Sequence, residues 1–546
     1  MNNSLVNKSA VNNSANHNSA TNNSKVKTYK TKDIGLDYLR KILLAKVYDV
    51  ARETELTKMT NLSSQLNQSI YLKREDQQPV QSFKIRGAYN KLANLVESKI
   101  ETNEIVTASA GNHAQGLALA AKKLNVKATI FMPITTPGIK VDNVKRLGGD
   151  VKLIGKNFDD AHAESIAYAK KNDLQFIHPF DDVDVIAGQG TIAKELLQQQ
   201  PNSDVIFIPV GGGGLLAGMA VYIKQLSPNT KIVGVEAEDS ACLKAALQAN
   251  RPIDLEHVGL FADGVAVKRI GKGTFNLIRK YCDDVITVNS DEICASIKDI
   301  FEQTRVIAEP AGALSLAGLK KYVSEASSDS NQKLVAILSG ANMSFHNLRY
   351  VSERCELGEK KEAVLAVTIP EEKESFKRFC QALDGRVITE FNYRFSSKRN
   401  GESDNRQAHI FVGVRLGDDI NERSNLIKNL VDANYQVDDL TDNELAKLHI
   451  RYMIGGTNSS PTNERIFRFQ FPEYPGALEL FLNTLGEFWN ITLFHYRNHG
   501  AAFGQVLAGF EISEKQQLSF FRHLKDLGYQ WQEETNNSAY RTFLGN

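Results

Sequence analysis

A lysine set between apolar residues and a glycine is the clearest candidate for covalent chemistry. It is Lys84, in the segment Ser82-Phe83-Lys84-Ile85-Arg86-Gly87-Ala88. A lysine amine that burial deprives of its proton can condense with an aldehyde. A lysine with apolar neighbours is more commonly a helix-surface residue whose stem packs along the protein. Taken alone, this segment leaves both interpretations open.

Two further segments could bind anions at points where a strand gives way to a helix. The first, Ser109-Ala110-Gly111-Asn112-His113, offers helix N-terminal amides with Ser and Asn side chains, which suit a carboxylate. The same Ser or Asn could simply cap the helix. The second, Gly211-Gly212-Gly213-Gly214-Leu215, exposes backbone N–H groups to which a phosphate can come close. Its position between strand and helix favours phosphate binding over a flexible loop, and its spacing matches neither common nucleotide-binding motif.

A hydroxyl group follows another predicted strand, in the segment Leu338-Ser339-Gly340-Ala341-Asn342. Ser339 could bond to a neutral ring nitrogen, or it could belong to a plain turn. The segment Glu309-Pro310-Ala311-Gly312-Ala313 is typical of a helix start, with an acid near the positive end of the helix. A lysine, a carboxylate site, a phosphate site and a ring-nitrogen partner are together what a pyridoxal-phosphate enzyme requires. We therefore interpret these segments as parts of one cofactor site.

Short β-branched runs alternate with helical stretches from about residue 65 to 340, which predicts an α/β fold with parallel sheets. Ligands of such sheets bind at the carboxyl ends of the strands. The predicted strands are Ile105–Ala108, Val126–Met132, Val151–Ile154, Val205–Val210, Ile232–Glu236, Val285–Val288 and Leu334–Leu338. The predicted helices between them include Ala114–Leu124, Asp159–Lys171, Thr191–Gln199 and Leu215–Leu226.

Composition excludes several classes of protein. The 546 residues contain 65 Lys plus Arg against 64 Asp plus Glu, so no basic excess points to nucleic acid or to an anionic membrane. No run of apolar residues is long enough to span a bilayer. The five cysteines form no C-x-x-C pair, and we expect neither a metal site nor a disulfide framework. We expect a cytoplasmic enzyme with several domains.

The first residues differ in composition from the rest of the chain. Residues 1–24 contain nine Asn and five Ser but no acid and no Phe, Trp or Tyr. Such a segment buries too little apolar surface to offset the entropy of ordering, so we predict that residues 1–30 are a disordered tail. A transit peptide is the alternative, because the segment is rich in Ser and poor in acids. It lacks arginine and an amphipathic period, which favours the solvated tail.

Two stretches near the carboxyl end resemble each other at an offset of about 100 residues. Each contains a strand, a proline, an amphipathic helix and a second strand ending in Tyr-Arg, followed by a polar turn and a further strand. The stretches are Ala363–Phe395 and Arg465–Arg497, followed by the strands His409–Leu416 and Gly504–Ile512. Each copy fits a small β-α-β-β-α-β unit.

Several segments resemble the fold type II, tryptophan-synthase-β-like pyridoxal-phosphate enzymes, and with the doubled C-terminal unit they resemble the biosynthetic threonine deaminases (threonine ammonia-lyases). They are SFKIRGAYNKL, TASAGNHAQG, VGGGGLLAG, VGVEAEDSACLKAAL, LSGANM and LAKLHIRYMIGG. The resemblance covers about residues 33–546. It implies a two-lobed parallel-sheet catalytic domain over residues 31–354. It also implies two α+β, ACT-like (ferredoxin-like) regulatory units over residues 363–438 and 463–540.

The resemblance also implies roles for individual residues. Lys84 would bind the aldehyde of pyridoxal 5'-phosphate covalently and later remove the α-proton of the substrate, with Phe83 packed against the ring. Gly211, Gly212, Gly213, Gly214 and Leu215 would hold the phosphate. Ser339 would partner the pyridine nitrogen, and Asn112 the phenolic oxygen. The substrate carboxylate would lie in the loop of Ser109, Gly111, Asn112 and His113.

The implied activity is a carbon–nitrogen lyase reaction that converts L-threonine, and also L-serine, to a 2-oxo acid and ammonia. For threonine the product is 2-oxobutanoate, and the reaction begins isoleucine biosynthesis. The resemblance further implies inhibition by isoleucine, relief by valine and a homotetramer. Catabolic serine/threonine dehydratases and serine racemases are the nearest alternatives, but they lack the doubled C-terminal region. An inert, amino-acid-sensing protein is a different alternative, and the intact Lys84, glycine run and Ser339 argue against it.

Overall fold

The computed structural model describes most of the chain. The described residues are 33–98, 103–325, 331–358, 361–370, 375–384, 386–395, 407–417, 421–450, 463–472, 480–486, 488–489, 491–497 and 503–543. The predicted tail, residues 1–30, lies outside them. Within the described residues, no helix combines the length and the apolar character that crossing a lipid bilayer would require.

The larger of two lobes is built on a six-stranded sheet with the order β1-β2-β10-β7-β8-β9. Its strands are β1 (Leu56–Lys58), β2 (Ser69–Arg74), β7 (Val205–Pro209), β8 (Lys231–Ala237), β9 (Asp284–Val288) and β10 (Lys333–Leu338). All neighbouring strands run parallel except β1, which pairs antiparallel with β2. The predicted parallel sheet is therefore confirmed, with one antiparallel strand added at its edge.

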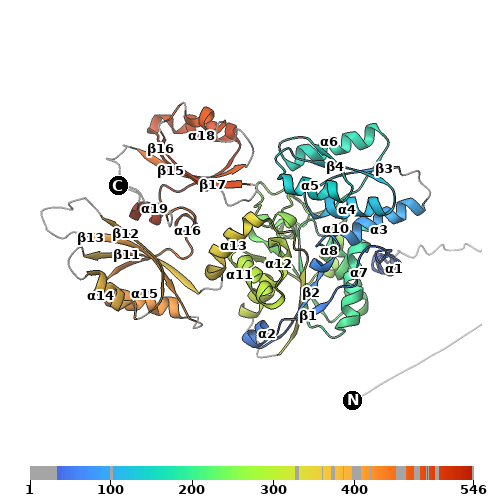
Figure 1. The fold of residues 1–546 in the computed structure, drawn as a ribbon, viewed down its shortest axis with the longest axis horizontal. Coiled ribbons are helices and arrows are strands. Elements are labelled where there is room, and N and C mark those ends of the chain that lie inside the picture. Colours follow the sequence, from blue (N-terminus) through green and yellow to red (C-terminus); the bar gives the residue numbers. More distant parts are fainter. Residues whose placement is uncertain are drawn as a thin grey trace, which may run out of the picture.

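Helices cover both faces of this sheet (Figure 1). Alternate residues of each strand point to opposite faces, so in β10 Val335 and Ile337 join one core while Leu334 and Ala336 join the other. The first core lies under α1 (Ile34–Leu43), α7 (Val183–Gln199), α8 (Gly214–Leu226) and α10 (Lys272–Tyr281). The second lies under α2 (Thr60–Leu66), α11 (Ser290–Thr304), α12 (Pro310–Glu325) and α13 (Phe345–Gly358). The short helix α9 (Cys242–Ala249) follows β8.

The smaller lobe contains a four-stranded parallel sheet with the order β5-β4-β3-β6. Its strands are β3 (Glu104–Ala108), β4 (Lys127–Met132), β5 (Asp150–Leu153) and β6 (Gln175–Phe176). Its helices are α3 (Lys84–Glu97), α4 (Asn112–Lys123), α5 (Gly138–Arg146) and α6 (Phe158–Lys171). The helices α3 and α4 begin between the two lobes, and this places their first residues beside the end of β10.

Two four-stranded antiparallel sheets follow, and their strand orders, β12-β13-β11-β14 and β16-β17-β15-β18, are equivalent. The first unit contains β11 (Glu362–Pro370), α14 (Ser375–Ala382), β12 (Ile388–Phe395), β13 (Gln407–Arg415), α15 (Glu422–Asp432) and β14 (Gln436–Asp439). The second contains β15 (Glu464–Pro472), a π-helical segment (Leu482–Gly486), β16 (Ile491–Arg497), β17 (Phe503–Glu511), α18 (Gln517–Leu527) and β18 (Gln530–Glu533). The predicted internal repeat of ferredoxin-like units is thus confirmed.

The two repeated units share one apolar core. Val364 and Ala366 of the first sheet and Ile466 and Leu507 of the second belong to the same buried cluster. Two short helices, α16 (Glu444–Leu448) and α19 (Ser538–Phe543), contribute to that cluster and lie between the sheets (Figure 1). The units are therefore packed together and cannot move as fully independent bodies without exposing apolar surface.

Candidate active site

Lys84 is the first residue of α3 and lies where the two lobes meet. The chain before it pairs with the end of β10, because Ser82 and Gly340 form an isolated antiparallel bridge. The Phe83 backbone N–H donates to the Ser339 backbone oxygen over 3.2 Å. The predicted lysine and hydroxyl segments are thus hydrogen-bonded to each other, although they are more than 250 residues apart in the chain.

The environment of Lys84 favours its uncharged form. Burial lowers the pKa of Lys84 to about 8, while the negative charge of Glu309 opposes that effect. The Lys84 amine lies 5.3 Å from the centre of the Phe83 ring. An amine with this pKa is partly deprotonated near neutral pH, as a nucleophile or a general base must be.

Asn112 and Glu309 form a hydrogen-bonded polar pair that lines the same pocket as the lysine. The Asn112 side-chain amide donates to Glu309 Oε1 over 2.6 Å, and its oxygen accepts from the Asn342 side chain over 2.7 Å. Burial, followed by the negative charge of Asp263, raises the pKa of Glu309 to about 7. Glu309 can therefore gain or lose a proton at physiological pH. The sequence had indicated only that Glu309 is an acid at the start of a helix, not that it titrates in this range.

The glycine run forms a close-packed turn between β7 and α8. A Cβ atom at Gly212 would lie 2.2 Å from the Phe180 ring, so a larger residue does not fit there. Gly213 has a φ of +89°, a conformation that L-residues with side chains rarely adopt. Because α8 begins at Gly214, the N–H groups of its first turn have no partner inside the helix. Unpaired N–H groups at a helix start are the donors that an anion site requires.

One pocket brings most of the predicted site residues together. Of these residues it contains Phe83, Lys84, Asn112, Gly211, Gly212, Gly213, Gly214, Leu215 and Ser339. Residues that were not predicted complete its wall: Pro179, Phe180, Gln189, Pro209, Gly264, Val265, Val267, Glu309 and Ala311. Ser339 is buried, and its hydroxyl donates to the Ala311 backbone oxygen over 3.2 Å.

The remaining predicted residues, Ser109, Gly111 and His113, do not line that pocket but lie at the adjoining start of α4. Gly111 precedes the helix, and no side chain caps its first turn. The Gly111 N–H donates to the Ser109 hydroxyl over 3.3 Å. Burial, followed by the positive charge of Lys84, lowers the pKa of His113 to about 3, so its ring is neutral at physiological pH. This uncapped helix start is compatible with a carboxylate site.

Comparisons with known proteins agree with this geometry. Residues 47–340 match the family model described as pyridoxal-phosphate dependent enzyme. Residues 353–450 and 455–544 match the model described as C-terminal regulatory domain of threonine dehydratase. The biosynthetic L-threonine dehydratase IlvA of Escherichia coli (strain K12) is 56% identical over 510 residues, which are 93% of this chain and 97% of that protein.

The chain belongs to the biosynthetic threonine dehydratases. Threonine dehydratase and threonine deaminase are two names for one enzyme family, so the resemblance stated from the sequence is confirmed. The mitochondrial threonine dehydratase of Saccharomyces cerevisiae is 48% identical over 93% of this chain and 89% of its own length. The processed form of threonine deaminase isoform 2 from Solanum lycopersicum has a TM-score of 0.57 and 46% identity. That structure aligns with 59% of this chain and 93% of its own.

The cofactor of this family, pyridoxal phosphate, fits the pocket of this threonine dehydratase family member. The fit rests on chemistry that the structure shows. A partly deprotonated lysine amine suits an aldehyde. A turn of glycines before a helix suits a phosphate. A buried hydroxyl suits a ring nitrogen. The residues that would hold the group are therefore Lys84, the glycine run and Ser339, with Asn112 beside them.

Sequence reasoning missed two residues of the pocket wall that matter to its chemistry. Glu309 is buried, and its negative charge raises the pKa of Lys84. From the sequence, its position before a helix indicated only an acid near the positive end of that helix. Phe180 packs against Gly212, and its ring lies edge-on to His178, with 4.6 Å between the ring centres. Phe180 comes from a loop after β6 that has no chemistry-bearing pattern, so only the folded structure identifies it.

Proposed function

We propose that the protein converts L-threonine to 2-oxobutanoate and ammonia, with L-serine as a second substrate, and so begins isoleucine biosynthesis. The observation that carries this proposal is the placement of Lys84 in one pocket with the glycine turn and Ser339. The high identity to biosynthetic threonine dehydratases over nearly the whole chain supports it. Pyridoxal phosphate, when bound, withdraws electrons from the amino-acid substrate and makes its α-proton acidic.

The residues of this chain would each perform one task in that reaction. The Lys84 amine would accept the α-proton at its Nζ atom, because its lowered pKa leaves it partly unprotonated. The start of α4 would hold the substrate carboxylate through its backbone N–H groups. The Ser339 hydroxyl donates to the Ala311 backbone oxygen in this structure and would turn to donate to a neutral ring nitrogen. A neutral partner of this kind favours rapid loss of the β-hydroxyl over longer-lived carbanion chemistry. The walls of the pocket would exclude water from the reacting atoms.

Regulation by amino acids is the second part of the proposal. Isoleucine would inhibit and valine would relieve the inhibition by binding the repeated units, which match a threonine dehydratase regulatory domain. An effector acts only if it binds two conformations unequally, and the core shared by the two units offers an arrangement that could switch as a whole. We also propose a homotetramer in the cytoplasm, with catalysis in residues 31–354 and regulation in residues 363–438 and 463–540.

A 2-oxo-acid assay tests the proposal directly. Purified protein is given threonine or serine, each with and without isoleucine. We expect 2-oxobutanoate from threonine, pyruvate from serine, and inhibition of both reactions by isoleucine. If threonine yields no 2-oxobutanoate, the proposed activity is wrong; if serine alone yields no pyruvate, only the second substrate is wrong. If isoleucine leaves the rate of threonine conversion unchanged, only the proposed regulation is wrong.

A further inference from the structure

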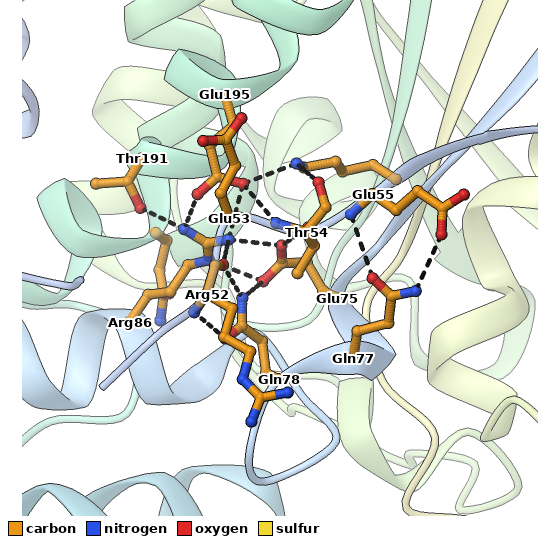
Figure 2. A network of polar contacts seen from close by, with 12 residues as sticks. Arg52, Glu53, Thr54, Glu55, Glu75, Gln77, Gln78, Arg86, Thr191 and Glu195 are labelled. Atoms are coloured by element: carbon orange, nitrogen blue, oxygen red, sulfur yellow. Dashed lines mark hydrogen bonds and ion pairs between the residues drawn. The ribbon is translucent and has the colours of Figure 1, made fainter. Parts of the chain in front are cut away.

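A buried network of charged groups lies at the first turn of α3 (Figure 2). It includes Arg86, which follows Lys84 by two positions in the sequence. Its centre is the Arg86 guanidinium, which is fully buried. It donates to both oxygens of Glu75 over 2.8 Å, and to the two oxygens of Glu195 over 2.6 and 3.0 Å. It also donates to the Thr191 hydroxyl over 3.1 Å. The planar guanidinium group of one arginine is thus hydrogen-bonded to two carboxylates.

The second cation of the network is Lys73, which is also fully buried. Its three ammonium donors reach Glu195 Oε2 over 2.7 Å, the Thr54 backbone oxygen over 2.7 Å and the Gln199 side chain over 3.0 Å. Two cations therefore face two carboxylates. The Arg86 guanidinium holds the pKa of Glu195 below its usual range even though burial alone would raise it.

The network joins three parts of the catalytic domain. Glu75 stands at the end of β2, Arg86 in the first turn of α3, and Glu195 in α7. The helices α3 and α7 touch at their backbones, because a Cβ atom on Gly188 would lie 2.7 Å from the Arg86 backbone oxygen. On the opposite side, a Cβ atom on Gly116 of α4 would lie 3.1 Å from the Ile85 nitrogen. The start of α3 is held from both sides.

We propose that Arg86 is a positioning residue for Lys84. By joining α3 to β2 and α7, it fixes the turn from which the Lys84 side chain leaves the backbone, and so fixes the direction of the amine into the pocket. This inference deepens the proposed function and rests on Lys84 as the reactive amine. Arg86 itself does not line the pocket.

Stability alone is a weak reason for this network. Apolar side chains of similar volume commonly replace a buried ion pair with no loss of stability, because desolvating the charges offsets their attraction. An arginine bound on two sides fixes the relative orientation of the elements that it joins, since the planar group admits few orientations of its partners. Displacement of a reacting group by about 1 Å costs on the order of 100-fold in rate, so a small movement of α3 would be measurable.

The test uses paired substitutions that keep the charge of the buried cluster balanced. The double variant Arg86→Met/Glu75→Gln removes one cation and one anion and leaves Lys73 paired with Glu195. The matched control, Arg74→Met/Asp76→Asn, removes another buried bidentate pair from the same end of β2, in which Arg74 donates to both Asp76 oxygens over 2.8 Å. No hydrogen bond between that control pair and α3 is present among the described residues. Arg86→Lys keeps the positive charge but not the planar contact.

Two readouts separate positioning from folding. In the full chain without cofactor, competitive acylation of Lys84 followed by peptide mass spectrometry gives the pKa of the Lys84 amine. We expect about 8 in the unsubstituted protein, and a rise in Arg86→Met/Glu75→Gln because a loosened turn admits water to the amine. With cofactor and threonine, kcat should fall by about 10- to 100-fold in that variant while KM changes by less than about threefold.

Melting temperatures complete the comparison, because they show whether each double variant is folded at the assay temperature. A control variant with an unchanged Lys84 pKa and kcat supports the proposal. A folded Arg86→Met/Glu75→Gln protein whose Lys84 pKa and kcat match those of the control overturns it. If that variant fails to fold, Arg86→Lys decides by the same two readouts. Failure of the unsubstituted protein to convert threonine would overturn the proposed function and leave the acylation test intact.

Discussion

At the scale of single residues, the pocket contains two titratable groups whose pKa values burial shifts in opposite directions. Burial lowers the pKa of Lys84 to about 8 and raises that of Glu309 to about 7. Burial shifts both toward their uncharged forms, while the Glu309 charge opposes the shift of Lys84 and the Asn112 hydrogen bond opposes that of Glu309. Because the Glu309 charge raises the pKa of Lys84, removing that charge should lower the pKa of Lys84 further.

This coupling predicts the pH dependence of turnover. Because the Lys84 amine must be unprotonated to accept a proton, kcat should rise with pH through the pKa of that amine in the substrate complex, which burial holds below the usual range of lysine. The Glu309 charge raises the pKa of Lys84, so Glu309→Gln should move that rise to lower pH. The measurement is kcat for threonine from pH 6 to 10, with Asp254→Asn as the control in an exposed ion pair with Arg269. An unmoved or upward-shifted profile for Glu309→Gln would contradict the assignment.

The residues that sequence alone could identify are those whose chemistry has a recognisable pattern. Lys84, the glycine run and Ser339 each follow or precede a strand in a motif, and the structure places all of them in one pocket. Glu309 and Phe180 carry no such motif. Their effect comes from burial and from contacts across the fold, which local sequence does not encode.

At the scale of elements, strands were predicted to within a residue or so, because buried parallel strands form compact β-branched runs. The structure gives β10 as Lys333–Leu338 against the predicted Leu334–Leu338.

The helix α7 begins at Val183, eight residues before the predicted start. Its true start is set by Asp182, whose side chain accepts from two backbone N–H groups, a capping signal that the prediction overlooked. The strand β2 was missed because its sequence, SIYLKR, ends in two charges, of which Lys73 is paired in the buried network and Arg74 is paired with Asp76.

The glycine turn makes a prediction at this scale. In Gly212→Ala, the added methyl group would overlap the Phe180 ring. Overpacking of this kind costs about 1–3 kcal/mol. This folding cost is an upper limit for the loss of binding free energy, so at about 1.4 kcal/mol per tenfold the cofactor affinity should fall by up to about 150-fold. A fluorescence titration of the cofactor-free protein with pyridoxal phosphate measures the change.

Gly138→Ala is the control for that titration, because it also lies at the start of a helix and a Cβ atom there would have no neighbour within 4 Å. Its affinity for the cofactor should equal that of the unsubstituted protein. Equal affinity in Gly212→Ala would show that the turn is not the phosphate site.

At the scale of the whole molecule, the catalytic domain and the repeated units meet at Asp291, near the start of α11. This carboxylate accepts from Lys447 of α16 over 2.7 Å and from Arg354 of α13. All three side chains are largely buried. Because α16 also belongs to the core shared by the two regulatory sheets, a change in that core would move a cation bound to the catalytic domain.

Lys447→Met should therefore weaken communication between effector and active site. Coupling of this kind commonly amounts to about 5- to 150-fold in affinity, so we expect the isoleucine concentration for half-inhibition to change by at least about fivefold. Maximal turnover of threonine without effector should stay within about twofold. Lys231→Met, in an exposed ion pair with Asp284, is the control and should change neither quantity. Unchanged inhibition in Lys447→Met would place the coupling elsewhere.

The central claim is that the Lys84 amine binds the aldehyde of pyridoxal phosphate. Borohydride reduction of the protein loaded with the cofactor, followed by digestion and peptide mass spectrometry, measures this most directly. The account predicts a single phosphopyridoxyl group, located on Lys84 in the peptide that contains Ser82 and Phe83. A phosphopyridoxyl group on a different lysine, or none on Lys84 after full loading, would contradict it.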